Sequence, residues 1–323
     1  MIADETIDGV RDPADWSDLT APVNPFTNAK IIGVGVPAEV YLASAAKRGH
    51  KDYAMSRSAL MEFAKCPKRW VNGYREDATT EKDWGSLLDC LVLEPAKFAE
   101  RFATTPDTYG PDNKKWNFNA TECKEWRKAH EAKQIVKPSD VEEAEIARRA
   151  LMADEKIAEF VNCSDKQVMV VAEYRDEETG IGVPVKCLID LVPDVNMTSK
   201  FADDLGDLKT CSFAAPGFWV KQVEQFNYHV QASLYLDTFN AATGEKRNGF
   251  RHVIQENYPP YQTAKRWLTD EFIKLGRKRY KEALKRYAAC LKAGEWPDYD
   301  DGGQMNIDGW RETAPTDYMM LNQ

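Results

Sequence analysis

The chain has 323 residues, of which 43% are hydrophobic and 11% aromatic, so it can bury a sizeable core and is not a disordered chain. No apolar run approaches the roughly 18 residues that suggest a membrane span. The first residues, MIADETIDGVRDPADW, are acidic and lack the basic-then-apolar order of a signal peptide. We therefore expect a soluble, cytoplasmic protein that does not bind a membrane.

Seven cysteines are scattered without a CxxC pair, which argues against a zinc knuckle and a thioredoxin-type motif and favours free, mostly buried thiols. The net charge of −9 argues at first against nucleic acid, but residues 114–137 and 262–294 are locally basic. A polyanion responds to the field within a Debye length of roughly 8–10 Å. These two segments are therefore either DNA-contact surfaces or ordinary solvated faces.

The N-terminal half is predicted to be helical. Residues 1–50 mix Asp, Pro and small residues and are interpreted as an N-terminal extension. Residues 53–74 predict a helix with Ser56 or Ser58 as its cap and a break or kink at Pro67. Further helices are predicted over residues 84–95 and 138–161.

Beyond residue 162 the pattern changes to β-strands. Residues 167–194 give two β-rich runs around a Glu-Thr-Gly turn, which predicts a hairpin. The order of helices, hairpin, strand, helix, strand and helix predicts an α/β fold, with helices flanking a central mixed sheet. The later elements are a strand over 206–212, a long helix over 215–244, a strand over 250–261, a basic helix within 262–294 and an acidic tail over 295–323.

An acid and a lysine lie two residues apart in LGDLKTC. Because side chains alternate along a strand, Asp207 and Lys209 are predicted to share one face and Leu208 to point to the other. A surface ion pair is the alternative, since the same spacing recurs elsewhere in this chain. Asp190, within the apolar run KCLIDLVPD, needs a partner, a metal or solvent at a strand end. Two acids on neighbouring strands beside a lysine would form a hard-oxygen pocket suited to Mg²⁺ or Mn²⁺.

Six segments, in order over about residues 51–290, resemble the RecE (exonuclease VIII-type) branch of the PD-(D/E)XK nucleases, which is related to the RecB nuclease domain. The resemblance implies a restriction-endonuclease-like core over residues 51–294, with helical N-terminal elements. The matching segments are SRSALMEFAKCPKRW, WGSLLDCLVLEPAKF, VAEYRDEETGIGVPVKCLIDLVPD, GDLKTCS, YHVQASLYLD and FRHVIQENYPPY.

The resemblance also implies roles for individual residues. Asp190 and Asp207 would bind the catalytic metal, and the backbone carbonyl of Leu208 would add a ligand. Lys209 would orient or activate the attacking water. Glu173, at the start of the hairpin, is a weaker candidate ligand.

Other positions extend or depart from the family pattern. Gln231 and Tyr235 are four residues apart, hence on one face of their helix, and would face the site; an exposed Gln231 with a half-buried Tyr235 is the alternative. Asp89 stands where the family has a histidine, so it either serves as an oxygen ligand or marks a weakened nuclease. Some relatives use a cysteine equivalent to Cys66 in an iron–sulfur centre, but here only Cys290 lies near the C-terminus, so no cluster is expected.

The resemblance implies a Mg²⁺-dependent exodeoxyribonuclease that degrades linear double-stranded DNA ends, 5′-to-3′, for phage-type homologous recombination. It would act as a homo-oligomer and leave single-stranded DNA for a partner, a single-strand annealing protein. The alternative is a catalytically weakened nuclease fold that binds DNA ends or a partner protein. The predicted DNA-contact residues are Lys114, Lys115, Arg127, Lys278, Arg279 and Lys281.

Overall fold

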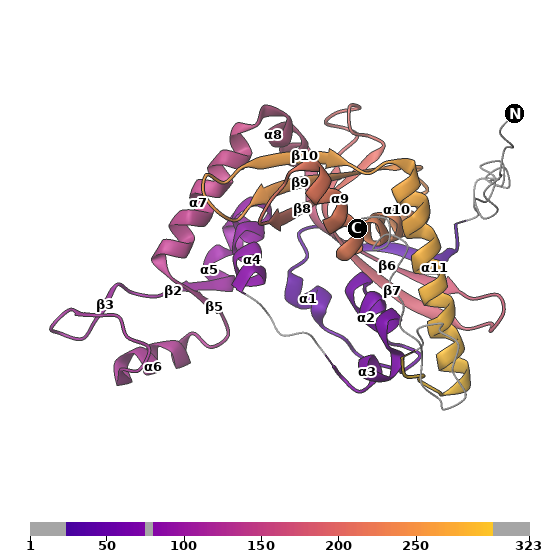
Figure 1. The fold of residues 1–323 in the computed structure, drawn as a ribbon, viewed down its shortest axis with the longest axis horizontal. Helices are drawn as coiled ribbons and strands as arrows, with labels where there is room; N and C mark the ends of the chain where they lie inside the picture. Colours follow the sequence, from indigo (N-terminus) through magenta and orange to yellow (C-terminus); the bar gives the residue numbers. More distant parts are fainter. Residues whose placement is uncertain (1–23, 75–79, 300–323) are drawn as a thin grey trace, which may run out of the picture.

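A six-stranded sheet forms the centre of the computed structural model, which describes residues 24–74 and 80–299 (Figure 1). Its strand order is β1-β6-β7-β8-β9-β10. Neighbouring strands are antiparallel except β8 and β9, which are parallel, so the sheet is mixed as predicted. The strands are β1 (Phe26–Gly33), β6 (Ser164–Arg175), β7 (Gly182–Pro193), β8 (Asp204–Cys211), β9 (Gly249–Glu256) and β10 (Thr263–Trp267).

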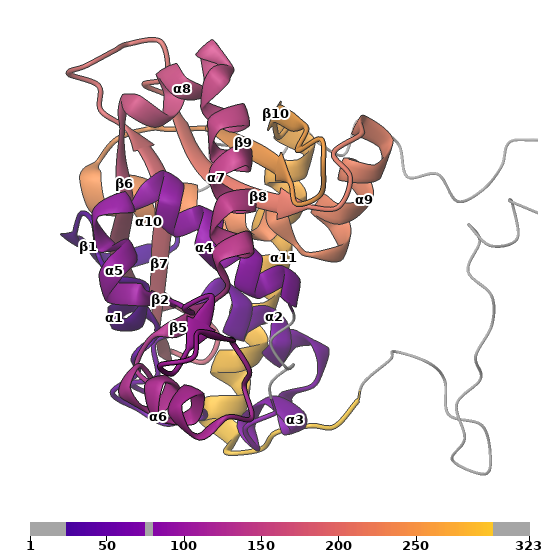
Figure 2. The same ribbon diagram turned by 90° about the vertical axis from the view of Figure 1, so that its left-hand side faces the viewer.

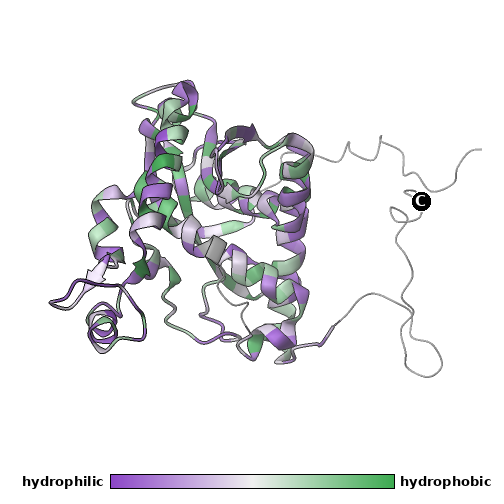
Figure 3. Ribbon diagram, turned by 60° about the vertical axis from the view of Figure 1, so that its left-hand side comes forward, coloured by the Kyte–Doolittle hydropathy of each residue, from purple (hydrophilic) through white to green (hydrophobic). Residues whose placement is uncertain are grey.

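Helices cover both faces of this sheet (Figure 2). Alternate strand residues enter separate cores: Leu205 and Phe250 pack in the core under α10 and α11, whereas Leu208 and Val253 pack under α7 and α8. Hydrophobic segments accordingly gather in the central strands (Figure 3). The first layer contains α2 (Arg57–Lys65), α3 (Pro67–Val71), α10 (Tyr228–Thr243) and α11 (Asp270–Ala293); the second contains α4 (Thr80–Leu93), α7 (Pro138–Ala153) and α8 (Glu155–Asn162).

Smaller elements complete the described chain. A projecting arm carries α6 and a two-stranded ladder of β3 and β4 (Figure 1). Among the described residues no helix has both the length and the apolar character to cross a membrane. All seven cysteines are free and buried, as predicted. The remaining elements are α1 (Ala38–Leu42), η2 (Pro95–Lys97), α5 (Phe98–Arg101), β2 (Phe102–Thr104), β3 (Thr108–Tyr109), β4 (Lys114–Lys115), α6 (Thr121–Ala129), β5 (Gln134–Val136) and α9 (Pro216–Gln225).

Local sequence signals set several boundaries. Ser56 caps α2 by accepting a hydrogen bond from the backbone N–H of Ala59 at 3.2 Å, which confirms one of the two predicted caps. The helix predicted over residues 138–161 is two helices, because the Asp154 carboxylate accepts from the N–H groups of Lys156 and Ile157 and starts α8.

Two predicted boundaries were wrong. The long helix over residues 215–244 is interrupted at Asn227, whose φ of 55° lies in the left-handed region that asparagine tolerates better than most residues. The basic helix predicted to follow the strand that ends at residue 261 begins only at Asp270. Residues 263–267 form β10 instead, because they pair with β9.

Within the expected N-terminal extension over residues 1–50, residues 1–23 lie outside the described part, and the strand that follows them packs on the domain. Residues 26–33 form β1, which pairs with β6 and closes one edge of the central sheet. Phe26 is 5% exposed and belongs to the main core, so this segment contributes apolar burial as well as backbone hydrogen bonds. The acidic tail predicted over 295–323 lies mostly outside the described residues, and its start packs Trp296 against Trp70.

Candidate active site

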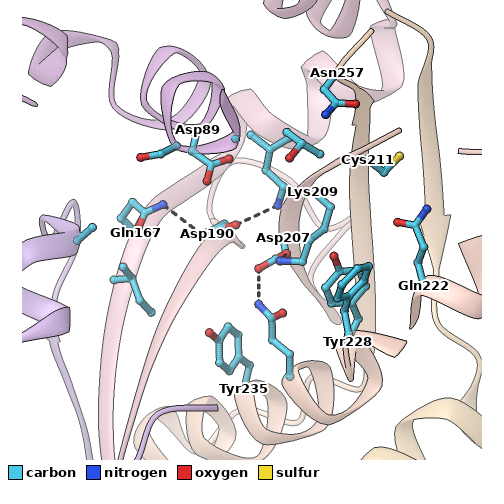
Figure 4. Close-up of a pocket in the computed structure, with 18 of the residues that line it drawn as sticks. Asp89, Gln167, Asp190, Asp207, Lys209, Cys211, Gln222, Tyr228, Tyr235 and Asn257 are labelled. Atoms are coloured by element: carbon cyan, nitrogen blue, oxygen red, sulfur yellow. Dashed lines mark hydrogen bonds and ion pairs between the residues drawn. The ribbon is translucent and has the colours of Figure 1, made fainter. Parts of the chain in front are cut away.

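The central sheet opens between β7 and β8. In the described chain their register consists of one pair, Leu191 with Gly206. Asp190 and Asp207 are the next residue of each strand beyond that pair. The backbone N–H of Leu208 donates to Asp190 Oδ2 at 3.0 Å, so a side chain takes the place of a strand-to-strand backbone bond. The opening of the sheet therefore brings two carboxylates from adjacent strands to one place (Figure 4).

A cavity of about 1020 Å³ lies over this opening. Both helical layers and the sheet contribute to its wall, so the cavity forms only when segments far apart in sequence have packed together. Figure 4 shows Asp89 reaching it from α4 and Tyr235 from α10. The predicted site residues that line it are Asp89, Asp190, Asp207, Leu208, Lys209, Gln231 and Tyr235.

Asp207 is held by partners on both carboxylate oxygens. Its side chain is buried at 2% exposed, Gln231 Nε2 donates to Oδ1, and Lys209 Nζ forms an ion pair with Oδ2. Arg57 Nη2 in turn donates to Gln231 Oε1 at 3.3 Å and orients the amide. The Lys209 ammonium also lies 5.0 Å from the centre of the Tyr228 ring. Asp207 and Lys209 thus share one face of β8, and Gln231 faces them.

Burial and neighbouring charges change the pKa values of Asp190 and Lys209. For Asp190 the two effects act together, whereas for Lys209 they oppose each other. Burial and the charge of Asp207 raise the pKa of Asp190 well above its usual value. Burial lowers the pKa of Lys209, but the charges of Asp207 and Asp190 outweigh it, and the net shift is upward. The lysine is therefore a cation at neutral pH, and it partly offsets the negative charge of the acids.

Asp89 differs from the other two acids because nothing in the described chain donates a hydrogen bond to its carboxylate or forms an ion pair with it. Burial raises the pKa of Asp89 to about 7; Lys209 lowers it and Asp207 raises it further. The helix that carries it comes close to β8 at Gly85, where a Cβ would lie 3.0 Å from the Thr210 hydroxyl oxygen. A side chain at position 85 would require the Thr210 side chain or this part of α4 to shift.

Comparison with known proteins shows the family and the fold to which this arrangement belongs. Residues 56–307 match the family described as "PDDEXK-like domain of unknown function (DUF3799)". The chain belongs to this family. The fold is the PD-(D/E)XK nuclease fold, an α/β restriction-endonuclease-like architecture, which confirms the fold class predicted from sequence. No curated protein matches the sequence.

A solved structure from Eubacterium rectale, described as a "Putative exonuclease", shares this PDDEXK-like architecture. It aligns with a TM-score of 0.53 at 17% sequence identity, over 90% of this chain and 99% of that chain. At this identity the likeness concerns the fold.

The donor set of this PDDEXK-like cavity has the chemistry that a hard divalent cation requires. The Asp89 carboxylate is unpartnered, and Asp207 Oδ2 has no hydrogen-bond donor in the described chain besides the Lys209 ammonium. Carboxylate oxygens are the ligands that Mg²⁺ and Mn²⁺ prefer. Among the described residues, however, no three His, Cys, Asp or Glu side chains lie close enough together to hold a metal ion.

The structure places Glu173 outside the cavity. Its side chain pairs with Arg175 at 3.3 Å and packs against Gly182, near the turn of the hairpin. β6 instead contributes Gln167, which lies nearer the opening of the sheet. Glu173 does not line the cavity, so this arrangement lends no support to the weaker suggestion that it is a metal ligand, which stays a prediction.

None of the six predicted DNA-contact residues lines the cavity. Lys114 and Lys115 are exposed on β4 in the projecting arm. Arg127 lies 5.4 Å from the Phe118 ring in the same arm. On α11, Lys278 is exposed and Lys281 is half-buried, whereas Arg279 is bonded to Glu224 Oε1 at 2.7 Å and to His229 Nε2 at 3.0 Å. A DNA-contact role for these residues stays a prediction.

Three residues that line the cavity or orient its side chains were not predicted from the sequence. Gln167 Nε2 donates to Asp190 Oδ1 at 3.2 Å from a backbone with φ of 53°, an uncommon conformation for a residue other than glycine. Arg57 orients Gln231, and Tyr228 covers Lys209. Arg57 lies within a segment that resembles the nuclease family, which was the available signal; the sequence offers no comparable signal for Gln167.

Proposed function

We propose that this protein is a Mg²⁺-dependent exodeoxyribonuclease that hydrolyses phosphodiester bonds at the ends of linear double-stranded DNA. The observation that carries the proposal is the meeting of Asp190, Asp207 and Lys209 where the sheet opens, with Asp89 beside them. Two strand acids and a lysine are the groups that PD-(D/E)XK chemistry requires. The E. rectale neighbour described as a "Putative exonuclease" supports the choice of reaction class.

Each side chain has a role that its position supports. Asp89, Asp190 and Asp207 would hold the metal, with Mn²⁺ as the alternative to Mg²⁺, and the Leu208 carbonyl would add a ligand. The metal, when bound, would polarise a phosphoryl oxygen and lower the pKa of a water. Lys209 is placed to position the attacking water and to offset charge that develops on the phosphate. Gln231 keeps Asp207 oriented.

The finer features of the proposal rest on the RecE resemblance. They are 5′-to-3′ digestion, a homo-oligomeric enzyme, a role in phage-type recombination and a single-strand annealing protein as partner. The cavity supports an end-directed enzyme, because its walls come from both helical layers and enclose the acids on several sides. A strand terminus enters such a space more easily than an uninterrupted duplex does.

The test compares one plasmid in two forms. The purified protein should degrade the linearised plasmid with Mg²⁺, spare the covalently closed circle, and do neither in EDTA. With linear DNA labelled at either the 5′ or the 3′ end, early release of labelled mononucleotides or short oligonucleotides from one of the two substrates would give the polarity of digestion. Equal cutting of the closed circle would indicate an endonuclease.

The second candidate function is a DNA-end-binding protein with weakened catalysis. Asp89 in place of the histidine of the RecE-type pattern favours it, as does the Lys209 ammonium lying directly on Asp207. This candidate predicts binding to linear DNA ends without any Mg²⁺-dependent loss of DNA in the same experiment.

A basic hollow adjoins the cavity and offers a path for the DNA backbone. This hollow, of about 590 Å³, shares Tyr41, Lys209, Gln225, Phe226 and Tyr228 with the cavity, so the two lie side by side. The cationic side chains that line the hollow are Arg48, Arg57, Lys65, Lys186 and Lys209.

We expect Arg57→Gln to weaken DNA binding more than Lys278→Gln does. Arg57 lines the hollow, whereas Lys278 is exposed on α11 outside it. A lost phosphate contact lowers the slope of log K against log[salt] by about one, and we expect that change for Arg57→Gln only. Fluorescence anisotropy over a salt series measures both quantities. The reverse order of effects would make α11 the DNA-tracking surface.

A further inference from the structure

Exposed aromatic rings line part of the cavity. Phe218 on α9, Phe226 at its end and Tyr258 in the β9–β10 loop all line the cavity, yet they are 45%, 45% and 53% exposed. Phe213, 53% exposed, stands against Phe218 with ring centres 5.7 Å apart. We call Phe218, Phe226 and Tyr258 the aromatic rim. Single exposed aromatics are ordinary, but three that line one charged cavity are not explained by packing.

The rim is connected to the reacting groups through ring contacts. The Phe226 and Tyr228 ring centres are 5.6 Å apart with an interplanar angle of 31°. Tyr228 in turn covers the Lys209 ammonium, 5.0 Å from its ring centre. A planar group resting on Phe226 would therefore lie one ring away from the lysine that contacts Asp207. The rim is at the correct place to hold the part of a substrate that flanks the scissile phosphate.

A polar group beside the rim also lacks a partner. The amide oxygen of Asn257, next to Tyr258, is buried with no hydrogen-bond partner in the described chain. Asn257 lines the cavity, and Figure 4 shows its side chain on the side of the cavity opposite Tyr235. A buried acceptor left unpaired costs free energy, so it is expected to meet a donor when a ligand is bound. Exocyclic amino groups of nucleobases are such donors.

We propose that the aromatic rim stacks unpaired nucleobases, so that the strand enters the cavity single-stranded rather than as part of a duplex. The inference rests on the proposed nuclease function and adds to it the form of nucleic acid that the site holds. Bases within a duplex have no free face, whereas frayed bases stack on aromatic rings, and an unpartnered amide reads their exposed edges. Phosphates of the same strand would follow the cationic hollow.

A docked protein fits these observations less well. The rings line a cavity whose wall also carries four carboxylates, an arginine and a lysine, so the surface beside them is charged rather than apolar. The hollow that adjoins the cavity is basic, which suits a polyanion. Stacked bases with their phosphates match both features at once.

The experiment measures binding without cleavage, with Ca²⁺ replacing Mg²⁺. Fluorescence anisotropy compares a 15-nucleotide single strand with a blunt duplex of the same length. We expect the wild-type protein to prefer the single strand. Phe218→Ala and Tyr258→Ala should each weaken single-strand binding about 5- to 100-fold, the range for loss of one stacked base, and leave the salt slope unchanged because no charge is removed.

Two kinds of control separate stacking from general disturbance. Trp267→Ala removes an aromatic that is 69% exposed on β10 and does not line the cavity, so it should not change binding. Phe218→Tyr and Tyr258→Phe keep a ring and should retain binding. A 2-aminopurine at the terminal position should be quenched on binding by the wild-type protein and less by the alanine variants.

Several outcomes would overturn the inference: no preference for the single strand, losses no larger than with Trp267→Ala, or equal losses in the ring-retaining variants. Because binding is read without hydrolysis, the two proposals can fail separately. A protein that shows the expected rim effects but never cuts DNA with Mg²⁺ would contradict the nuclease function and support stacking. A protein that cuts DNA with or without the rim would contradict stacking alone.

Discussion

Replacing Asp207 with asparagine should reduce Mg²⁺-dependent DNA hydrolysis by at least about 10³-fold. The change keeps the shape of the side chain and its hydrogen bond with Gln231, but it removes the negative charge that a cation and Lys209 both require. Loss of a single stabilising group at a charged transition state costs about 10²–10³-fold, and here the lost group would also hold the metal. Initial rates on linear duplex DNA give the measurement.

Asp165→Asn is the matched control, because Asp165 is an exposed acid on the neighbouring strand β6. It should cut DNA at the wild-type rate. Wild-type activity in Asp207→Asn would show that this strand is not catalytic. Lys209→Ala would confound catalysis with stability. It leaves the buried Asp207 carboxylate without its cation, which typically costs about 3–5 kcal/mol of stability.

Replacing Asp89 with asparagine should raise the Mg²⁺ concentration needed for half-maximal activity at least tenfold. Its carboxylate lies in the cavity with no donor or cation bound to it in the described chain, so a cation is the partner that its chemistry calls for. Removal of groups that only orient metal ligands already costs about 10–100-fold in metal affinity, and loss of a direct ligand should cost no less. A Mg²⁺ titration of the hydrolysis rate is the measurement, and Asp83→Asn, an exposed acid on the same helix, is its control.

The same variant should be more stable than the wild-type protein without metal, and the gain should depend on pH. Burial raises the pKa of Asp89 to about 7 from an unfolded value near 4, so the folded state holds the proton more tightly. The contribution of this group to stability is therefore lost as pH rises from about 4 to about 7. Asparagine does not ionise, so Asp89→Asn should unfold at a higher temperature at pH 8 and at nearly the wild-type temperature at pH 4.

A lower melting temperature with an unchanged Mg²⁺ requirement would show that Asp89 is a structural acid rather than a ligand. Thermal melts in EDTA at both pH values provide that comparison.

Much of the candidate site was predictable because it depends on local chemistry. Alternation along a strand puts Asp207 and Lys209 on one face, and a spacing of four puts Gln231 and Tyr235 on one helical face. The structure brings all four to one cavity, together with Asp190. The layered α/β fold was likewise predictable from the order of elements and from the family resemblance.

The remainder depends on long-range packing. Gln167 reaches Asp190 only because its backbone takes a left-handed conformation next to the opening of the sheet, and nothing in QVMVV indicates this. Glu173 seemed plausible because it precedes Asp190 in the same hairpin, but register carries it to the far end of β6. Asn227 divides a segment of uniformly helical character, since one residue with φ of 55° is sufficient to redirect the chain.

The pairing of β1 with β6 has a consequence for shortened forms of the protein. The family match begins at residue 56, after β1 and after α1, which supplies Ala38 and Tyr41 to the cavity wall. A protein trimmed to that match would have β6 as a bare edge, with unpaired N–H and C=O groups open to other chains. The trimmed protein would then self-associate through β6, and its cavity would lack the part of the wall that α1 provides. The segment before the matched residues would thus cover this sheet edge and complete the wall of the candidate site.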